Sequence, residues 1–208
     1  TFVGDNSFKS EENIKNNILR IFILYSVLSF IVLVFLKISG IRLFNSLNLA
    51  MTLISNGGFL PLDNLSDIIS SNFQKFILIL ALTMSMLNFY FLFNIFNKNT
   101  ILKEHNEDIY LLVFSLIFVL LIYFNNFDIL NLMISVLSSL ANSGLTLTKS
   151  DNNLSLYFLF LTIIGGSLIS NSSGIKLSRF YILIKITSAE IIKLIIPNSV
   201  INKTIFNS

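Results

Sequence analysis

Long apolar runs separated by short charged clusters constrain this chain more than any other feature. The first run extends from Asn17 to Leu36 and carries a single charge, Arg20, near its start. About 20 apolar residues cross a bilayer as a helix, so we predict that this run is the first spanning helix. The runs Phe73 to Phe96 and Ile109 to Phe124 predict two more spans, and a fourth begins over Leu154 to Ile169.

Composition agrees with a membrane environment. Hydrophobic residues make up 54% of the chain and charged residues 12%, with a mean hydropathy of +0.79, whereas soluble domains carry about 25% charged residues. The net charge of +3 is too small to favour a nucleic-acid partner, and none is expected. The absence of cysteine excludes disulfides and thiolate metal sites. The lipid bilayer is therefore the expected surrounding.

Two shorter apolar segments, Leu43 to Ile54 and Leu130 to Leu140, are too short to cross a bilayer, and a glycine-containing turn follows each. Irregular backbone at membrane depth is tolerated only where protein buries it or water lines it. We predict that each segment is a re-entrant helix whose following turn exposes carbonyls to a cation. The helix end, with roughly half a negative charge, favours a cation there.

The two turns repeat one pattern. Gly58 and Gly144 lie 86 positions apart, and Asn56 and Asn142 share that offset. Oxygen ligands without cysteine or paired histidine favour an alkali cation such as K⁺, so we predict a filter that binds such an ion through backbone carbonyls. An ordinary turn between packed helices is the alternative interpretation. The predicted filter residues are Asn56, Gly57, Gly58, Phe59, Asn142, Ser143, Gly144 and Leu145.

The fourth span is interrupted by small and polar residues over Gly165 to Gly174, where apolar residues are expected. We predict an unwound loop within the membrane, and a helix-packing face of small residues is the alternative. Lys176 follows as a residue that tunes this loop or as a plain interfacial anchor. The predicted loop residues are Gly165, Gly166, Ser170, Asn171, Ser172, Ser173, Gly174, Lys176 and Arg179.

Basic residues set the predicted orientation, because they accumulate on the cytoplasmic side. Both turns then open outward, where Asp63 is either a residue of the outer mouth or a simple turn residue.

The charged cluster around His105 is interpreted as a solvated linker and not as a metal or acid–base site. The expected units are residues 1–96, a cytoplasmic linker 97–108, a second unit 109–195 with a broken last helix, and a further linker 196–208.

These features together resemble the TrkH branch of the Trk/Ktr/HKT potassium transporters. The resemblance covers the order of helix, pore helix, glycine turn and helix, found twice, and the stretches Ile164 to Gly166 and Gly174 to Arg179. It implies an all-α membrane protein built of two tandem helix–pore loop–helix units, the second and third of four. It also implies that Gly58 and Gly144 are filter glycines, with Leu145 where an aromatic residue is usual, and that residues 165–174 form the gate loop.

The resemblance further implies potassium uptake across a bacterial cytoplasmic (inner) membrane, a homodimer, and a cytoplasmic nucleotide-binding regulatory subunit of the TrkA type. Because two units cannot enclose a four-unit pore, we expect the sequence to be part of a longer chain, and Ile196 to Asn198 resembles a linker into the fourth unit. A non-conducting remnant, or a half-subunit that needs a separately encoded partner, is an alternative. An integral-membrane enzyme is a minor alternative; no enzymatic activity and no bound cofactor are expected.

Overall fold

The computed structural model describes residues 2–89, 91–92, 106–123, 128–147 and 154–195. In these ranges the chain forms seven α-helices and a single short 3₁₀ turn, with no strand beyond one isolated bridge. The predicted all-α class is therefore confirmed. The elements are α1 (Phe2–Ile38), α2 (Leu43–Ser55), η1 (Leu65–Asp67), α3 (Asn72–Met86), α6 (Asn106–Tyr123), α7 (Ile129–Ala141), α8 (Ser155–Ile163) and α9 (Leu177–Ile195).

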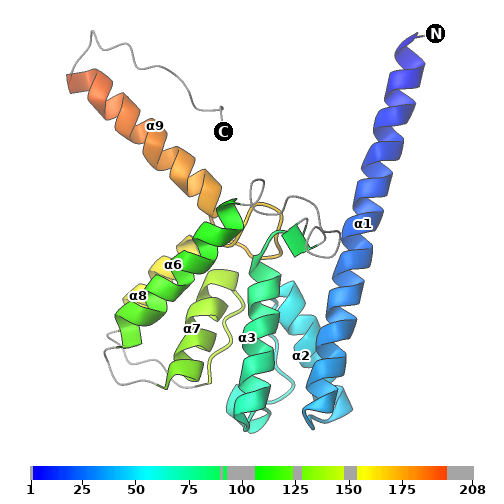
Figure 1. Ribbon diagram of the computed structural model, residues 1–208, viewed down its shortest axis with the longest axis vertical. Coiled ribbons are helices and arrows are strands. Elements are labelled where there is room, and N and C mark those ends of the chain that lie inside the picture. The colour runs from blue at the N-terminus through cyan, green and yellow to red at the C-terminus, as the bar shows by residue number, and fades with distance from the viewer. Residues whose placement is uncertain (1, 90, 93–105, 124–127, 148–153, 196–208) are drawn as a thin grey trace.

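Helix α1 is longer than the predicted first span. It begins at Phe2, so the polar start of the chain continues the helix instead of preceding it. At 1.5 Å per residue, 37 residues extend about 55 Å, against a hydrocarbon core of about 30 Å. Its apolar part, Ile18–Ile38, is the one helix in the described ranges that is long and apolar enough to cross a membrane. Figure 1 shows the remainder projecting beyond the helical body.

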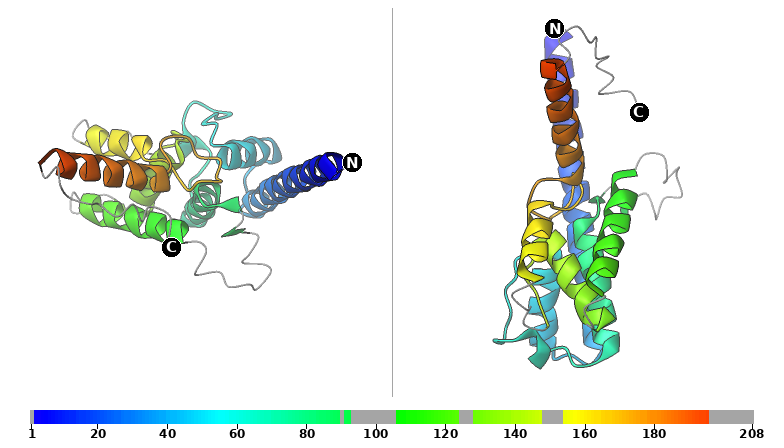
Figure 2. Two further views of the ribbon diagram at one scale, coloured as in Figure 1. Left: turned by 90° about the horizontal axis from the view of Figure 1, so that it is seen from above. Right: turned by 90° about the vertical axis from the view of Figure 1, so that its left-hand side faces the viewer.

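The helices pack side by side in an order that places α3 and α7 at the centre. Helix α1 packs on α2, α2 on α3, and α7 on both α6 and α8, while the most extensive contact joins α3 to α7. Figure 2, viewed from above, shows this central pair between α1 and α2 on one side and α6 and α8 on the other. Fully buried leucine and isoleucine side chains fill these contacts, including Leu49, Leu53, Leu78, Leu82, Ile134 and Leu140.

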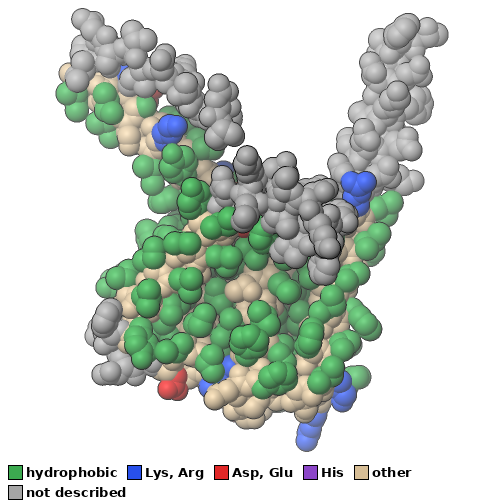
Figure 3. All heavy atoms as spheres, viewed as in Figure 1, with side chains coloured by type: hydrophobic (Ala, Val, Ile, Leu, Met, Phe, Trp, Pro, Cys, Tyr) green, Lys and Arg blue, Asp and Glu red, His purple; other side chains and the backbone are tan. Residues whose placement is uncertain are grey.

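The outward face of the bundle is apolar. Phenylalanines such as Phe22 and Phe30 on α1 and Phe76 on α3 expose more than half of their surface, and Figure 3 shows hydrophobic side chains over much of one face of the bundle. A soluble monomer rarely exposes a contiguous apolar patch larger than a few hundred Å². This surface fits a surrounding of lipid tails.

Helix α3 stops at Met86, although the sequence predicts one span from Phe73 to Phe96. Leu87 has an extended backbone, with φ −80° and ψ 160°. Two backbone bonds to a distant segment stabilise the break: Ser167 N donates to Met86 O at 3.0 Å, and Phe89 N donates to Ile169 O at 3.0 Å. Residues 93–96 lie outside the described ranges. The predicted single span is therefore interrupted by tertiary hydrogen bonding.

Helix α6 begins within the predicted linker. Glu107 and Asp108 lie in its first turn, where carboxylates are stabilised by the helix dipole. Asp108 is 1% exposed and accepts a hydrogen bond from Asn88 N at 2.9 Å, beside the break in α3. The Glu107 carboxylate accepts from Ser178 N at 3.2 Å, at the start of α9. Residues 97–105, including His105, and the linker 196–208 lie outside the described ranges.

Candidate cation pathway

The first glycine turn begins where Asn56 ends α2. Asn56 has a left-handed backbone, with φ 55° and ψ 32°, and Gly57 N donates to Thr52 O at 3.1 Å. This six-to-one bond is the mark of a Schellman helix end, in which asparagine is the usual substitute for glycine. Gly58 is also left-handed, with φ 70°. The Thr52 hydroxyl accepts from Phe59 N at 2.8 Å and holds the chain as it turns back.

The second turn repeats this geometry at the end of α7. Asn142 has φ 60° and ψ 31°, and Ser143 N donates to Ser138 O at 3.0 Å. Gly144 has φ 69°. The Ser138 and Ser143 hydroxyls lie 3.0 Å apart in a buried pair. Both asparagines therefore end a helix, and the sequence signal for this role is an asparagine two residues before the glycine.

The two turns lie against one another. A Cβ atom placed on Gly58 would approach Ser143 O to 2.4 Å, which no residue with a side chain permits. The structure thus brings together the two groups of residues that the sequence singles out. The residues that follow the two glycines differ in exposure: Phe59 is 81% exposed and Leu145 is 1% exposed. The Ser85 hydroxyl on α3 lies 3.0 Å from Asn56 Oδ1 and braces the first turn.

The segment between α8 and α9 is an irregular loop, as the sequence predicts. Its two arms pair, since Gly165 N donates to Ile175 O and Ile175 N donates to Ile163 O, both at 2.9 Å. Gly165 permits this close approach because a Cβ there would lie 1.9 Å from Ser173 O. Gly174 supplies a left-handed backbone, with φ 83°. The glycines are therefore needed for the loop's own closure.

Side-chain bonds fasten this loop internally and to α2. Gly166 N donates to the buried Ser172 hydroxyl at 2.8 Å, and the Ser170 hydroxyl donates to Ser167 O at 2.7 Å. The Asn171 amide donates to Ile54 O at 2.6 Å, and Ile54 lies two residues before Asn56, where the first glycine turn begins. Lys176 directs its ammonium into the loop, whereas Ser173 and Arg179 are exposed.

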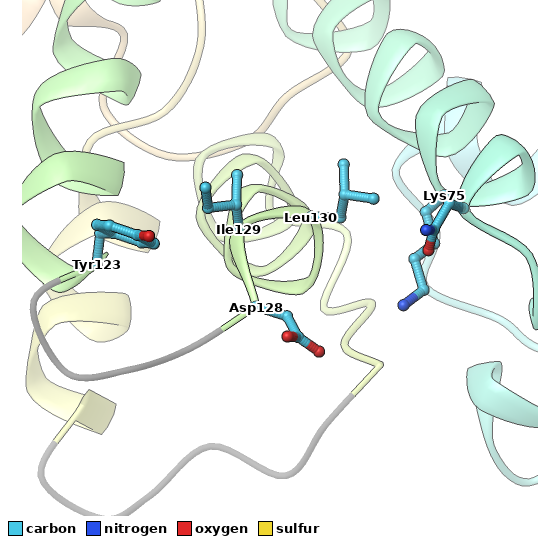
Figure 4. A pocket seen from close by; sticks show the side chains of 6 residues that line it. Lys75, Tyr123, Asp128, Ile129 and Leu130 are labelled. Atoms are coloured by element: carbon cyan, nitrogen blue, oxygen red, sulfur yellow. The ribbon is translucent and has the colours of Figure 1, made fainter.

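One end of the bundle carries charged side chains around a hollow. A cavity of about 480 Å³ opens between the start of α3, the end of α6 and the start of α7. Figure 4 shows Lys75 and Asp128 at this hollow, together with Tyr123. Asp63 is exposed after the first turn and does not line this cavity. The lining residues are Asn72, Lys75, Tyr123, Asp128, Ile129 and Leu130.

The chain is similar to known cation transporters in sequence and in fold. No protein-family model matches the chain. The chain is 29% identical over 190 residues to an uncharacterized cation transporter from Methanocaldococcus jannaschii, covering 88% of this chain and 38% of that protein. It superimposes on the crystal structure of the potassium transporter TrkH from Vibrio parahaemolyticus with a TM-score of 0.77 and 21% identity, covering 90% of this chain and 44% of that one.

The chain is thus a helical membrane protein, and its fold is that of a TrkH-type transporter. The predicted resemblance to TrkH is confirmed at the level of the fold, and the sequence is similar to that of a cation transporter. The chain spans about two fifths of the length of the proteins it matches, 38% and 44% respectively. Both of these proteins are described as transporters, and neither as an enzyme.

Proposed function

We propose that this chain forms part of a cation pathway across the membrane, with potassium as the transported ion. The observation that carries the proposal is the contact between the two glycine turns, in which Gly58 leaves no room for a side chain against Ser143 O. Two helices end at these turns, so two sets of partly negative helix ends and carbonyls converge. The similarity to an archaeal cation transporter supports the same function.

In this proposal the backbone carbonyls of residues 56–59 and 142–145 replace the hydration shell of a K⁺ ion. Each turn has two residues with a left-handed backbone, which reverse the direction of the chain: Asn56 and Gly58 in the first, Asn142 and Gly144 in the second. The carbonyls of these turns are therefore not committed to the hydrogen bonds of a helix. The bonds from Thr52 and Ser85 keep the first turn in place while an ion passes. The chemistry is coordination and dehydration, with no covalent step.

We propose that the loop of residues 164–176 is the gate on the inner side of this filter. The bond from the Asn171 amide to Ile54 O supports this role, because it joins the loop to the helix that carries the first turn. Opening requires this bond to break or the two segments to move together. The serine hydrogen bonds hold the loop in one defined conformation, unlike a frayed helix end.

A complete pathway needs further pore-loop segments around these two. The 81% exposure of Phe59, the last filter residue of the first turn, supports this conclusion. We propose that the two turns correspond to the second and third of four units. A half-subunit completed by a separately encoded chain is the second candidate.

The test is uptake of radioactive rubidium by potassium-starved cells that lack their own potassium transporters. The native reading frame that contains this sequence is expressed in wild-type form, with Gly58→Asp, and with Ser66→Asp as the matched control, which adds the same charge at an exposed residue outside both turns. We expect uptake from the wild type and the control and none from Gly58→Asp. Equal uptake by all three, at equal membrane abundance, would reject the filter; uptake only with a co-expressed neighbouring chain would identify a half-subunit.

We also propose that the assembled transporter is a homodimer that binds a cytoplasmic nucleotide-binding subunit of the TrkA type. Helix α9 supports a partner, because it leaves the body (Figure 1) and buries none of its residues within the described chain. Cross-linking of a single cysteine introduced at exposed Leu194 tests the dimer. Co-purification with and without ATP tests the regulatory subunit.

A further inference from the structure

The ammonium of Lys176 lies inside a cluster of four oxygens. Its Nζ atom is 3.3 Å from Ser170 Oγ, 3.4 Å from Ser170 O and 3.2 Å from Ser172 Oγ, and it also donates to Ser172 O. An ammonium has three donors, so the oxygens outnumber the protons that can reach them. Four oxygens therefore surround the Lys176 ammonium, as ligand oxygens surround a bound metal cation.

The protons of the two serines are already engaged elsewhere. The Ser170 hydroxyl donates its one proton to Ser167 O at 2.7 Å. The Ser170 and Ser172 hydroxyls lie 2.8 Å apart, so Ser172 is the donor of that bond. Both hydroxyls therefore present only lone pairs to Lys176. Together with two carbonyls, they form a neutral cradle of acceptors with no proton directed inward.

The cradle is firmly held and the lysine is less so. Ser172 is 4% exposed, and its hydroxyl also accepts from Gly166 N at 2.8 Å, which fixes it to the opposite arm of the loop. Lys176 is half-buried and reaches the cradle through a flexible four-carbon stem. The serine hydroxyls are therefore held by bonds that do not involve the lysine.

Neutral carbonyl and hydroxyl oxygens are the ligand set of monovalent cations such as K⁺. The other charged groups near this ammonium are Glu107, whose carboxylate is bonded to Ser178 N, and Arg179. No acidic side chain contributes to the cradle itself. This donor set matches a single positive charge and offers no carboxylate to a divalent ion.

We propose that the Ser170–Ser172 segment is a monovalent-cation site that the tethered ammonium of Lys176 occupies in this conformation. A permeating ion and the lysine compete for the same oxygens, so the closed loop carries its own blocking cation. This inference rests on the proposed function, since it needs an ion that reaches the loop.

The test uses the full-length protein purified in detergent. Equilibrium binding of radioactive rubidium is measured for the wild type, for Lys176→Met, and for Lys185→Met as a control that removes a charge from α9 outside the loop. We expect Lys176→Met to bind one more rubidium ion per chain than the wild type and the control. Adding Ser172→Ala to Lys176→Met removes one ligand, and the extra ion is expected to be lost.

Thermal unfolding is the second readout, and it covers a variant that folds poorly. At one hundred times its dissociation constant, K⁺ should raise the midpoint of Lys176→Met by roughly 5 °C relative to choline, and the wild type by less. Rescue of a poorly folded variant by K⁺ but not by choline supports the site. The same rubidium stoichiometry in all variants, or no response of Lys176→Met to K⁺, overturns it. Failure of the proposed function would instead appear as a wild type that takes up no rubidium.

Discussion

The two glycine turns have the same backbone and different surroundings. In each, a left-handed asparagine ends the helix and a left-handed glycine follows two residues later, with φ values that differ by only a few degrees (55° and 70° against 60° and 69°). A Cβ on Gly58 would meet Ser143 O at 2.4 Å, whereas one on Gly144 would meet nothing within 4 Å. The asparagine and the glycine at the helix end therefore set the backbone shape of each turn. The neighbouring residues decide whether a side chain can be added at the glycine.

The hydroxyls of the two turns make a second contrast. Thr52 and Ser138 occupy matching positions on α2 and α7, and the carbonyl of each accepts the six-to-one bond of its turn. The Thr52 hydroxyl accepts from a backbone amide, that of Phe59. The Ser138 hydroxyl pairs with another hydroxyl, that of Ser143. Beyond the backbone bond that the two turns share, the first is therefore held by a bond from a backbone amide to a hydroxyl, and the second by a pair of hydroxyls.

The largest effect is expected for Gly58→Ala. The left-handed backbone costs alanine about 1–2 kcal/mol, and displacement of the Ser143 carbonyl adds a similar amount. We expect a loss of about 3 kcal/mol in the free energy of unfolding, measured by denaturant titration of the purified protein, and rubidium uptake reduced more than tenfold. A loss no larger than that of Gly144→Ala would break the distinction between the two turns.

Next in size is Thr52→Val, which keeps the shape of the side chain and removes the acceptor for Phe59 N. An unpaired amide in this position costs about 2 kcal/mol. Ser138→Ala should cost only about 1 kcal/mol, because the Ser143 hydroxyl keeps Ser138 O as an acceptor at 3.5 Å. Unfolding titrations give both values, and amide exchange at Phe59 should accelerate only in the threonine variant. Equal losses would show that the turns are held alike.

A smaller effect is expected for Gly144→Ala, because the strain of the left-handed backbone acts there without a clash. The free energy of unfolding should fall by about 1 kcal/mol. Gly144→Asn is the matched control, since asparagine adopts this backbone readily, as at Asn142. We expect it to recover most of the loss. An asparagine variant less stable than the alanine variant would mean that the space beside Gly144 is filled in the assembled protein.

The smallest effect is expected for Gly57→Ser, which copies the residue that the second turn has at Ser143. Gly57 does not have a positive φ. A Cβ there would lie 3.1 Å from the Ser55 hydroxyl and 3.3 Å from the Phe59 ring, and both are side chains that can adjust. The midpoint of thermal unfolding should change by no more than about 2 °C. A larger drop would show that the pair of glycines, and not only Gly58, is required.

The apolar runs predicted most helices well, because burial in lipid leaves a direct mark on composition. Helices α2 and α7 begin and end within one residue of the predicted segments. The turns and the irregular loop were also predicted, since glycine and clustered small polar residues report backbone freedom directly. The role of Asn56 and Asn142 in ending the helices is readable from their position before glycine.

The break in α3 was not predicted, and its cause explains why. Met86 and Leu87 carry no glycine or proline signal; the break exists because Ser167 and Ile169 supply backbone partners from a distant segment. Asp108 was predicted to be solvated because it belongs to a charged cluster, yet it is buried against Asn88 N. Both errors arise from hydrogen bonds between residues far apart in the chain, which local composition does not encode.

The interruption of α3 has a mechanical consequence. The backbone on both sides of Leu87 is bonded to the loop, through Met86 O and Phe89 N, and Asn88 N is bonded to Asp108 on α6. The loop that follows α8 therefore shares hydrogen bonds with the end of α3, and that end shares one with α6. A rearrangement of the loop would have to break these bonds or carry the segment around Leu87 with it.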